Sequence, residues 1–145
     1  MRKLAAALIV LFFCWGCAPS PRYTIIRAGS KSSVPFLTGD VLMEKPPVGT
    51  RFRGIASFYA DKYHGNKTAN GEIFDMYGLT CAMNILPFNT WLEVRNLANN
   101  HTVIVRVNDR GPFVEGRIID LSLGAAKELG MVGTGVQEVE ITVIR

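Results

Sequence analysis

The amino-acid sequence predicts a mainly β fold with one or two short helices, confined to a single domain from Gly54 to Arg145. Two observations support this prediction. From Gly54 onward, short apolar or alternating runs are separated by Gly, Asn and Pro, a texture typical of strands joined by turns. In addition, a length of roughly 90 residues is enough for one packed core but marginal for more than one.

The expected strands follow one another along this domain. Residues 97–101, between the third and fourth strands, include Asn99 and Asn100, which tolerate the positive φ of a tight hairpin turn. Ser122 has the features of a helix N-cap, and the helix that it begins, Leu123–Leu129, is ended by Gly130. The six predicted strands are Gly54–Tyr59, Gly78–Met83, Thr90–Asn96, Thr102–Asn108, Arg117–Leu121 and Val136–Ile144.

The N-terminus predicts export. A basic head, Met1–Lys3, precedes the uncharged run Leu4–Trp15, which is too short to cross about 30 Å of hydrocarbon comfortably. Residues 1–16 therefore read as a secretory signal peptide. The small residue Gly16 before Cys17 resembles a lipoprotein signal, in which Cys17 receives lipid, including palmitate, and becomes the first residue of the mature protein. The alternatives are an ordinary signal peptide and an uncleaved anchor helix.

The segment from Cys17 to Arg53 is predicted to be a flexible tether. It contains five of the seven prolines and the polar stretch Gly29–Ser33, without helical periodicity. One extended piece is expected near Tyr23–Arg27. Such a tether would space the domain from the membrane.

Composition excludes several classes of function. Without Arg2 and Lys3 the chain has 14 basic and 12 acidic residues and no basic cluster, so no nucleic-acid partner is expected. His64 and His101 have no partners at metal-ligand spacing, so no metal and no cofactor are predicted. Cys81 is the only cysteine left after processing, which excludes a disulfide within the mature monomer, and its apolar surroundings favour a buried, inert thiol over a nucleophile.

The fourth predicted strand ends in a candidate acid. If side chains alternate, Asp109 ends an apolar row, and a carboxylate at the rim of an apolar face favours its protonated form and suits a proton donor. The alternative is that Asp109 merely opens the turn at Gly111–Pro112. The row on the side of Asp109 contains Val103, Val105 and Val107, and the opposite row contains Arg106, Asn108 and Arg110.

A second polar segment, Lys67–Glu72, lies in the long loop after the first strand. Glu72 and Asp109 together have the composition of the carboxylate pair that cleaves glycosidic bonds. The alternative is that Glu72 is a solvated loop charge. Three aromatic residues, Tyr59, Tyr63 and Trp91, either offer flat faces to sugar rings or fill the core.

Four motifs together resemble the rare lipoprotein A family of septal-ring lytic transglycosylases. They are Gly54–Tyr59, Thr68–Glu72, Val107–Phe113 and Arg117–Ser122, in order and at the family's spacing. The resemblance implies a six-stranded double-psi β-barrel in an outer-membrane lipoprotein that faces the periplasm. It also implies that the partners are peptidoglycan glycan strands and, through the lipid on Cys17, the membrane. We expect a monomer.

The resemblance further implies a lyase that cleaves the bond between N-acetylmuramic acid and N-acetylglucosamine and leaves 1,6-anhydromuramic ends. The family's roles carry over to Asp109 as the acid and to Glu72 as the supporting carboxylate. Asp120 also matches the family pattern, and we interpret it as a structural anchor. The expected substrate contacts are Tyr59, His64, Thr68, Asn70, Asn84, Asn108 and Arg110.

The sequence departs from the family at Met83, where a histidine is typical. Methionine neither transfers a proton nor orients a carboxylate by a hydrogen bond. Either Asn84 or His64 takes the place of this histidine, or catalysis is weak or absent. The second hypothesis is therefore a non-catalytic, expansin-like lipoprotein that binds or loosens peptidoglycan, and a third is a lipoprotein that docks other proteins.

Overall fold

The computed structural model describes residues 25–26, 45–59 and 61–145. The predicted signal peptide (residues 1–16), the lipidation of Cys17 and most of the tether (residues 17–53) therefore lie outside the described residues. Within the expected extended piece, β1 (Ile25–Ile26) pairs antiparallel with the start of β2. No helix among the described residues is both long enough and apolar enough to cross a membrane.

The six predicted strands are confirmed, each within a few residues of its expected bounds. A short 3₁₀ helix, η1 (Asp61–Tyr63), follows the first of them, and one α-helix, α1 (Leu123–Glu128), precedes the last. The strands are β2 (Arg51–Tyr59), β3 (Thr80–Ala82), β4 (Trp91–Asn96), β5 (Thr102–Asp109), β6 (Arg117–Ser122) and β7 (Val136–Val143).

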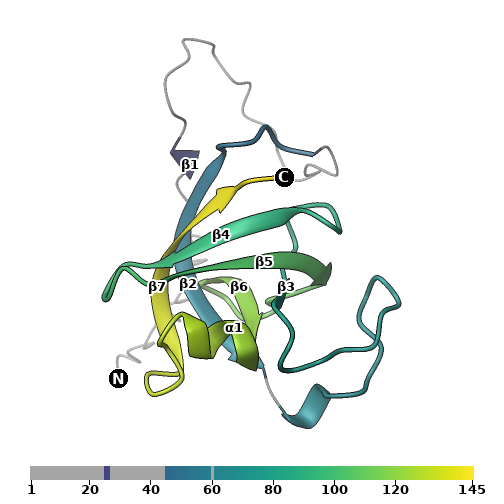
Figure 1. Cartoon of the computed structure of the whole chain (residues 1–145). Helices are drawn as coiled ribbons and strands as arrows, with labels where there is room; N and C mark the ends of the chain where they lie inside the picture. Colours follow the sequence, from purple (N-terminus) through teal and green to yellow (C-terminus); the bar gives the residue numbers. More distant parts are fainter. Residues whose placement is uncertain (1–24, 27–44, 60) are drawn as a thin grey trace, which may run out of the picture.

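The six strands form a closed barrel (Figure 1). The hydrogen-bonded order is β2-β6-β3-β5-β4-β7, and the ladder between β2 and β7 closes it, from Arg51 opposite Thr142 to Ser57 opposite Val136. The pairs β2–β6 and β3–β5 are parallel, and the other pairs are antiparallel. Strands that are distant in the sequence are therefore neighbours in the barrel, and the polar residues at their ends lie close together.

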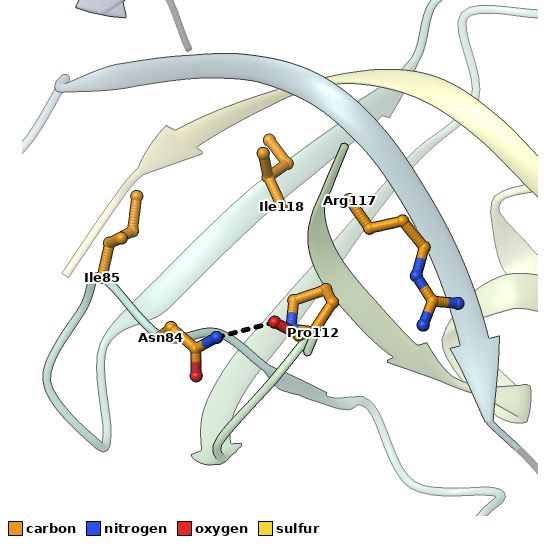
Figure 2. Close-up of a pocket in the computed structure, with 5 residues that line it drawn as sticks. All are labelled: Asn84, Ile85, Pro112, Arg117 and Ile118. Atoms are coloured by element: carbon orange, nitrogen blue, oxygen red, sulfur yellow. Dashed lines mark hydrogen bonds between the residues drawn. The ribbon is translucent and has the colours of Figure 1, made fainter. Parts of the chain in front are cut away.

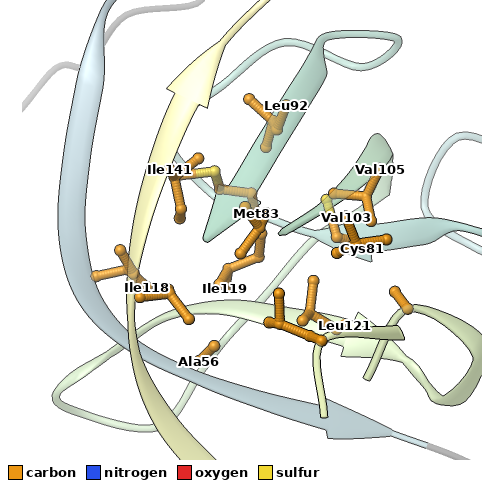
Figure 3. Close-up of a cluster of buried hydrophobic side chains, with 14 of the residues drawn as sticks. Ala56, Cys81, Met83, Leu92, Val103, Val105, Ile118, Ile119, Leu121 and Ile141 are labelled. Carbon is orange, nitrogen blue, oxygen red and sulfur yellow. The ribbon is translucent and has the colours of Figure 1, made fainter. Parts of the chain in front are cut away.

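The barrel interior is filled by the apolar side chains of alternating strand positions (Figure 3). Cys81, in the middle of β3, and Met83, just after its end, are both fully buried in this core. Opposite them lie side chains from the other strands, among them Ala56, Leu92, Val105, Ile119, Leu121 and Ile141. Alternation thus directs every second residue of these strands inward and leaves the others on the outer face.

Helix α1 begins and ends as predicted. The Ser122 hydroxyl oxygen accepts a hydrogen bond from the Ala125 amide at 3.2 Å, which is an N-cap bond, and Gly130 adopts a φ of +68° after the helix. In the turn between β4 and β5, Asn100 has a φ of +61°, as its position predicted. These three residues fix the places where the chain leaves regular structure.

The long loop between β2 and β3 extends beyond the barrel and returns against α1 (Figure 1). The Gly124 amide donates to the Met76 carbonyl at 2.8 Å, and the Ser122 hydroxyl donates to the Gly78 carbonyl. Phe74, which is buried, packs against the ring of Tyr59 with centroids 4.5 Å apart. The helix and the end of β2 therefore hold the loop over the ends of the strands.

Candidate active site

Asp109 does not end the inward apolar row, so this part of the sequence prediction was wrong. The ladder between β3 and β5 pairs Cys81 with Val107 but Ala82 with Asp109, which leaves Asn108 as an extra residue in β5. Such a bulge interrupts the alternation of side chains. Because Cys81 points into the core and Ala82 follows it, Ala82 and its partner Asp109 lie on the outer face.

The same register places four side chains in one row across four strands. Ser57 on β2 pairs with Asp120 on β6, Asp120 pairs with Ala82 on β3, and Ala82 pairs with Asp109 on β5. Directly paired residues of neighbouring strands point to the same face. Asp109 and Asp120 therefore lie on one face of the sheet, with only the small side chain of Ala82 between them.

The carboxylate of Asp109 is held through one of its oxygens. Oδ1 accepts hydrogen bonds from the backbone amides of Ala69 and Arg110, both at 2.8 Å. The bond from Arg110 supports the start of the turn, so Asp109 does have the structural role considered as the alternative. Among residues 45–59 and 61–145, no lysine or arginine forms a salt bridge with Asp109, and no hydrogen bond is made to Oδ2. One oxygen is thus left for a ligand.

Glu72 is bound by an arginine rather than by solvent alone. Arg106 donates to both carboxylate oxygens at 2.8 Å, and the Asn108 amide group donates to Oε2 at 3.2 Å. The hydrogen bonds from Arg106, with smaller effects of Asn108 and Asn70, lower the pKa of Glu72 to about 2. Glu72 is therefore a fixed, ionised carboxylate at neutral pH, and it is unsuited to donate a proton.

Two predicted substrate contacts shape the loop that carries Glu72. The Thr68 hydroxyl is buried and donates to the Asn70 side-chain oxygen at 2.7 Å, which in turn accepts from the Glu72 amide at 3.1 Å. The Asn70 amide donates to the Asn108 carbonyl at 3.3 Å, which ties the loop to the end of β5. Thr68 and Asn70 thus bring Glu72 to the strand end that holds Asp109.

Tyr59 lies beside the two aspartates with its hydroxyl group unsatisfied. Its ring packs on Phe74 and is 6.0 Å from that of Tyr63, while its hydroxyl oxygen is buried without a hydrogen-bond partner in the described chain. Burial is the main cause that raises the pKa of Tyr59, and the nearby charges of Asp109 and Asp120 add to it. The hydroxyl therefore stays protonated and is available as a donor.

The position of the missing histidine is in the core. The side chain of Met83 is fully buried (Figure 3), and only its backbone touches the site, where its amide donates to the Asp109 carbonyl at 3.2 Å. Neither expected substitute bonds to a site carboxylate. Asn84 bonds to Gly111 and Pro112, and the Nδ1 of His64 accepts from the Met76 amide at 3.2 Å.

The remaining candidates lie at the margin of the site. The Arg110 guanidinium group stacks over the ring of Phe88 at 3.6 Å and donates to the Met83 carbonyl at 3.0 Å. Desolvation lowers the pKa of Arg110. Trp91 is half-buried, pairs with Arg106 across the β4–β5 ladder and has the Arg145 guanidinium group 5.0 Å from its ring centre.

A small hollow of about 70 Å³ lies beside Pro112 (Figure 2). Its lining includes neither Asp109 nor Glu72. The Arg117 side chain points away from Asn84 and Pro112 (Figure 2), and its Nη1 donates to the Ser57 hydroxyl oxygen at 2.6 Å. The hollow is lined by Asn84, Ile85, Pro112, Arg117 and Ile118.

Sequence reasoning missed two features of the site. It did not identify Arg106 as the partner of Glu72, since 34 residues separate them and only the fold of the loop joins them. It also gave Asp120 no relation to Asp109, because the register of β6 and β5 against β3 cannot be read from alternation. The opposite charges of Glu72 and Arg106 were the one available signal.

Comparisons with known proteins agree with this fold. Residues 51–141 match the family model described as lytic transglycolase. The chain is 50% identical over 100 residues to the endolytic peptidoglycan transglycosylase RlpA of Helicobacter pylori, covering 69% of this chain and 32% of that protein. It is 54% identical over 97 residues to RlpA of Campylobacter jejuni, covering 67% and 35%. The chain thus spans about a third of the length of these curated relatives.

Two solved structures show the same barrel. The Streptomyces papain inhibitor superposes with a TM-score of 0.56 at 24% identity, over 73% of this chain and 100% of that one. The apo expansin of Clavibacter michiganensis gives a TM-score of 0.52 at 24% identity, over 66% and 50%. These likenesses confirm the predicted six-stranded double-psi β-barrel. From the family match over residues 51–141 and the identity to its relatives, this chain belongs to the lytic transglycolase family with an RlpA-like double-psi β-barrel.

Proposed function

We propose that the chain is a peptidoglycan lytic transglycosylase, which cleaves the bond between N-acetylmuramic acid and N-acetylglucosamine and leaves 1,6-anhydromuramic ends. The activity named for its relatives supports this proposal. The observation that carries it within the chain is Asp109, whose Oδ2 has no hydrogen bond from the described residues, close to the ionised carboxylate of Glu72.

In the proposed reaction Asp109 is the acid. It donates a proton to the glycosidic oxygen as the bond from that oxygen to the anomeric carbon breaks. The 6-hydroxyl oxygen of the muramic residue then bonds to the anomeric carbon, and its proton passes to the carboxylate of Asp109, so no water is consumed. Glu72, which Arg106 keeps ionised, stabilises the positive charge that develops at the anomeric centre.

The proposal includes the location of the protein. Cys17 carries lipid, the signal peptide is removed, and residues 17–53 tether the barrel to the outer membrane, facing the periplasm. The support is the pattern of residues 1–17 in the sequence. Metabolic labelling with an alkyne-tagged fatty acid, compared between the wild type and Cys17→Ala, tests this part separately.

Product analysis tests the activity. The protein from Ala18 to Arg145, incubated with purified glycan strands, is expected to release anhydromuramyl fragments detected by mass spectrometry. Asp109→Asn should abolish them at unchanged melting temperature, whereas Asp61→Asn, at an exposed position in η1, should not. Fragments from Asp109→Asn at the wild-type rate would exclude Asp109 as the acid.

The second candidate is a non-catalytic, expansin-like module that binds or loosens peptidoglycan. The placement of Met83 in the core favours it, because no imidazole stands beside the carboxylates. A mutant form of the Clavibacter michiganensis expansin, solved in complex with cellohexaose, has the same fold, with a TM-score of 0.52 at 20% identity. This candidate is supported if wild-type protein sediments with glycan strands but releases no fragments from them.

A further inference from the structure

The carboxylate of Asp120 is held by two neighbouring side chains. Ser57 donates to its Oδ1 at 2.5 Å, and the Arg117 Nε lies 3.7 Å from the same oxygen. Both contacts therefore use one oxygen. Among the described residues no hydrogen bond is made to Oδ2, although the side chain remains 17% exposed.

The free oxygen faces the turn that follows Asp109. Oδ2 lies 3.9 Å from the point where a Cβ on Gly111 would stand. Neighbouring strands are about 4.8 Å apart, so the backbones of Asp120 and Asp109, two strands apart, are separated by roughly 10 Å. Ala82 between them contributes only a methyl group, and Gly111 contributes no side chain at all. The space between the side chains of Asp109 and Asp120 is therefore bordered by small residues.

A donor without a partner lies on the same face. Tyr59 is two residues after Ser57 on β2 and therefore points to the same side, and its buried hydroxyl oxygen has no partner in the described chain. A buried polar atom left without a partner in a native protein needs an explanation, and a ligand is one. A sugar hydroxyl group is both donor and acceptor, so one such group can satisfy a carboxylate oxygen and the Tyr59 hydroxyl together.

We propose that Asp120 is a further glycan-binding residue, whose Oδ2 accepts a hydrogen bond from a sugar hydroxyl group while Ser57 and Arg117 hold its Oδ1. The inference rests on the proposed function, because it names the contact that positions the glycan against Asp109. Asp120 transfers no proton in this proposal. Ser57 and Arg117 act by fixing the orientation of its carboxylate.

The decisive variant is Asp120→Asn in the full chain, solubilised in detergent. Its Oδ1 still accepts from Ser57, but an NH₂ group replaces Oδ2 and cannot accept. We expect at least a tenfold loss of affinity for a soluble muropeptide-derived tetrasaccharide by isothermal titration, with an unchanged circular dichroism spectrum and a melting temperature lowered only slightly by the loss of the charge that faces Arg117. Asp61→Asn, at an exposed position in η1, is the control and should bind like the wild type. Wild-type affinity in Asp120→Asn would overturn the proposal.

A second measurement uses only the wild-type protein, so it does not depend on whether a variant folds. With ¹³C-labelled aspartate, the carboxyl signal of Asp120 is expected to shift on addition of the tetrasaccharide, together with that of Asp109, while the signal of the exposed Asp61 stays fixed. An Asp120 signal that does not move at saturating ligand would overturn the inference.

These outcomes are distinguishable from failure of the proposed function. If the wild type releases anhydromuramyl fragments while Asp120→Asn binds normally, the activity stands and the inference falls. If the wild type releases none, yet Asp120 shifts and Asp120→Asn loses affinity, the binding role stands and the lyase falls.

Discussion

Glu72 and Arg106 set the electrostatics of the site at the scale of single residues. The two hydrogen bonds from Arg106 make the ionised form of Glu72 the stable one, which in the proposed reaction leaves the role of acid to Asp109. Glu72 remains half-exposed, so solvent screens the ion pair and its contribution to the stability of the fold is small. Its main effect is to fix the orientation of the Glu72 carboxylate. The two acids thus differ in their partners, since Glu72 is bound by an arginine and Asp109 by two backbone amides.

This pairing predicts a pH-dependent contribution to stability. The pKa of Glu72 is lowered from 4.5 to about 2 on folding, so its contribution is complete above pH 4.5 and is lost as the pH falls toward 2. Because the Glu72 side chain is 42% exposed, solvent screening limits the contribution to at most about 1 kcal/mol. Glu72→Gln should therefore melt slightly lower than the wild type at pH 7 and equally at pH 2, by differential scanning calorimetry.

Glu93→Gln is the matched control, since Glu93 is exposed on β4. It should leave the melting temperature unchanged at both pH values. A Glu72→Gln deficit that is as large at pH 2 as at pH 7 would contradict the ion pair as its cause.

The same pair predicts an effect on catalysis. Glu72→Gln keeps a side chain of the same shape but removes the negative charge that the proposed reaction uses at the anomeric centre. The rate of fragment release should therefore fall about 10²-fold or more while glycan affinity is largely kept. Initial rates and binding isotherms on the same preparation separate the two. Equal loss of rate and affinity would instead assign Glu72 to substrate binding.

At the level of residues, the motifs predicted that Glu72 and Asp109 belong together, but not which face of the sheet Asp109 lies on. Glu72 and Asp109 lie at one strand end, as their motifs indicated, through the contacts of Asn70 and Asn108. The face of Asp109 was predicted wrongly because the bulge at Asn108 leaves no mark in the apolar pattern of β5. Bulges depend on the partner strand, which local sequence does not contain.

At the scale of elements, helix α1 positions the loop that carries Glu72. Gly124 is the contact point: a Cβ there would lie 2.3 Å from the Tyr77 carbonyl oxygen and 2.8 Å from its carbonyl carbon. Since these are backbone atoms, the loop would have to move. The short helix thus supports the end of the loop, at residues 76–78.

Gly124→Ala should therefore destabilise the protein by roughly 1–3 kcal/mol, despite the higher helix propensity of alanine. It should also reduce fragment release, because the loop that moves includes Glu72. Gly133→Ala, where nothing lies within 4 Å of the added Cβ, is the control and should be neutral or slightly stabilising. Urea unfolding of both variants measures the difference. Equal midpoints would show that the loop moves without loss of folding free energy.

The N-cap of this helix offers an independent test. Ser122→Ala removes the bond to the Ala125 amide and the bond to the Gly78 carbonyl, and a lost N-cap alone costs about 1 kcal/mol. Thr134→Ala, whose hydroxyl bonds to the Met131 carbonyl in an exposed turn, should cost less. The urea midpoints of the two variants give the order of their stabilities. A lower midpoint for Thr134→Ala than for Ser122→Ala would argue against a stabilising role of the N-cap.

For the molecule as a whole, strand positions were predictable and strand order was not. Alternation placed β4 and β7 to within a few residues, because it depends only on which side chains face the core. The closing ladder between β2 and β7 joins residues some 85 positions apart, as in the Arg53–Glu138 pair. Only the family resemblance supplied that topology, since no local pattern encodes it.

Closure of the barrel makes Cys81 a reporter of global unfolding. Its thiol is fully buried in the core, and burial raises its pKa, so the thiolate that reacts with alkylating agents is scarce in the folded state. The protein from Ala18 to Arg145, which contains no other cysteine, should resist iodoacetamide in native buffer and be modified at a rate set by opening of the whole barrel. Mass spectrometry follows the modification over a urea series.

The control is Glu93→Cys, in which the introduced thiol on the exposed face of β4 should react at once while Cys81 does not. Rapid native labelling of Cys81 would mean that the barrel opens locally at β3, without unfolding of β2 and β7.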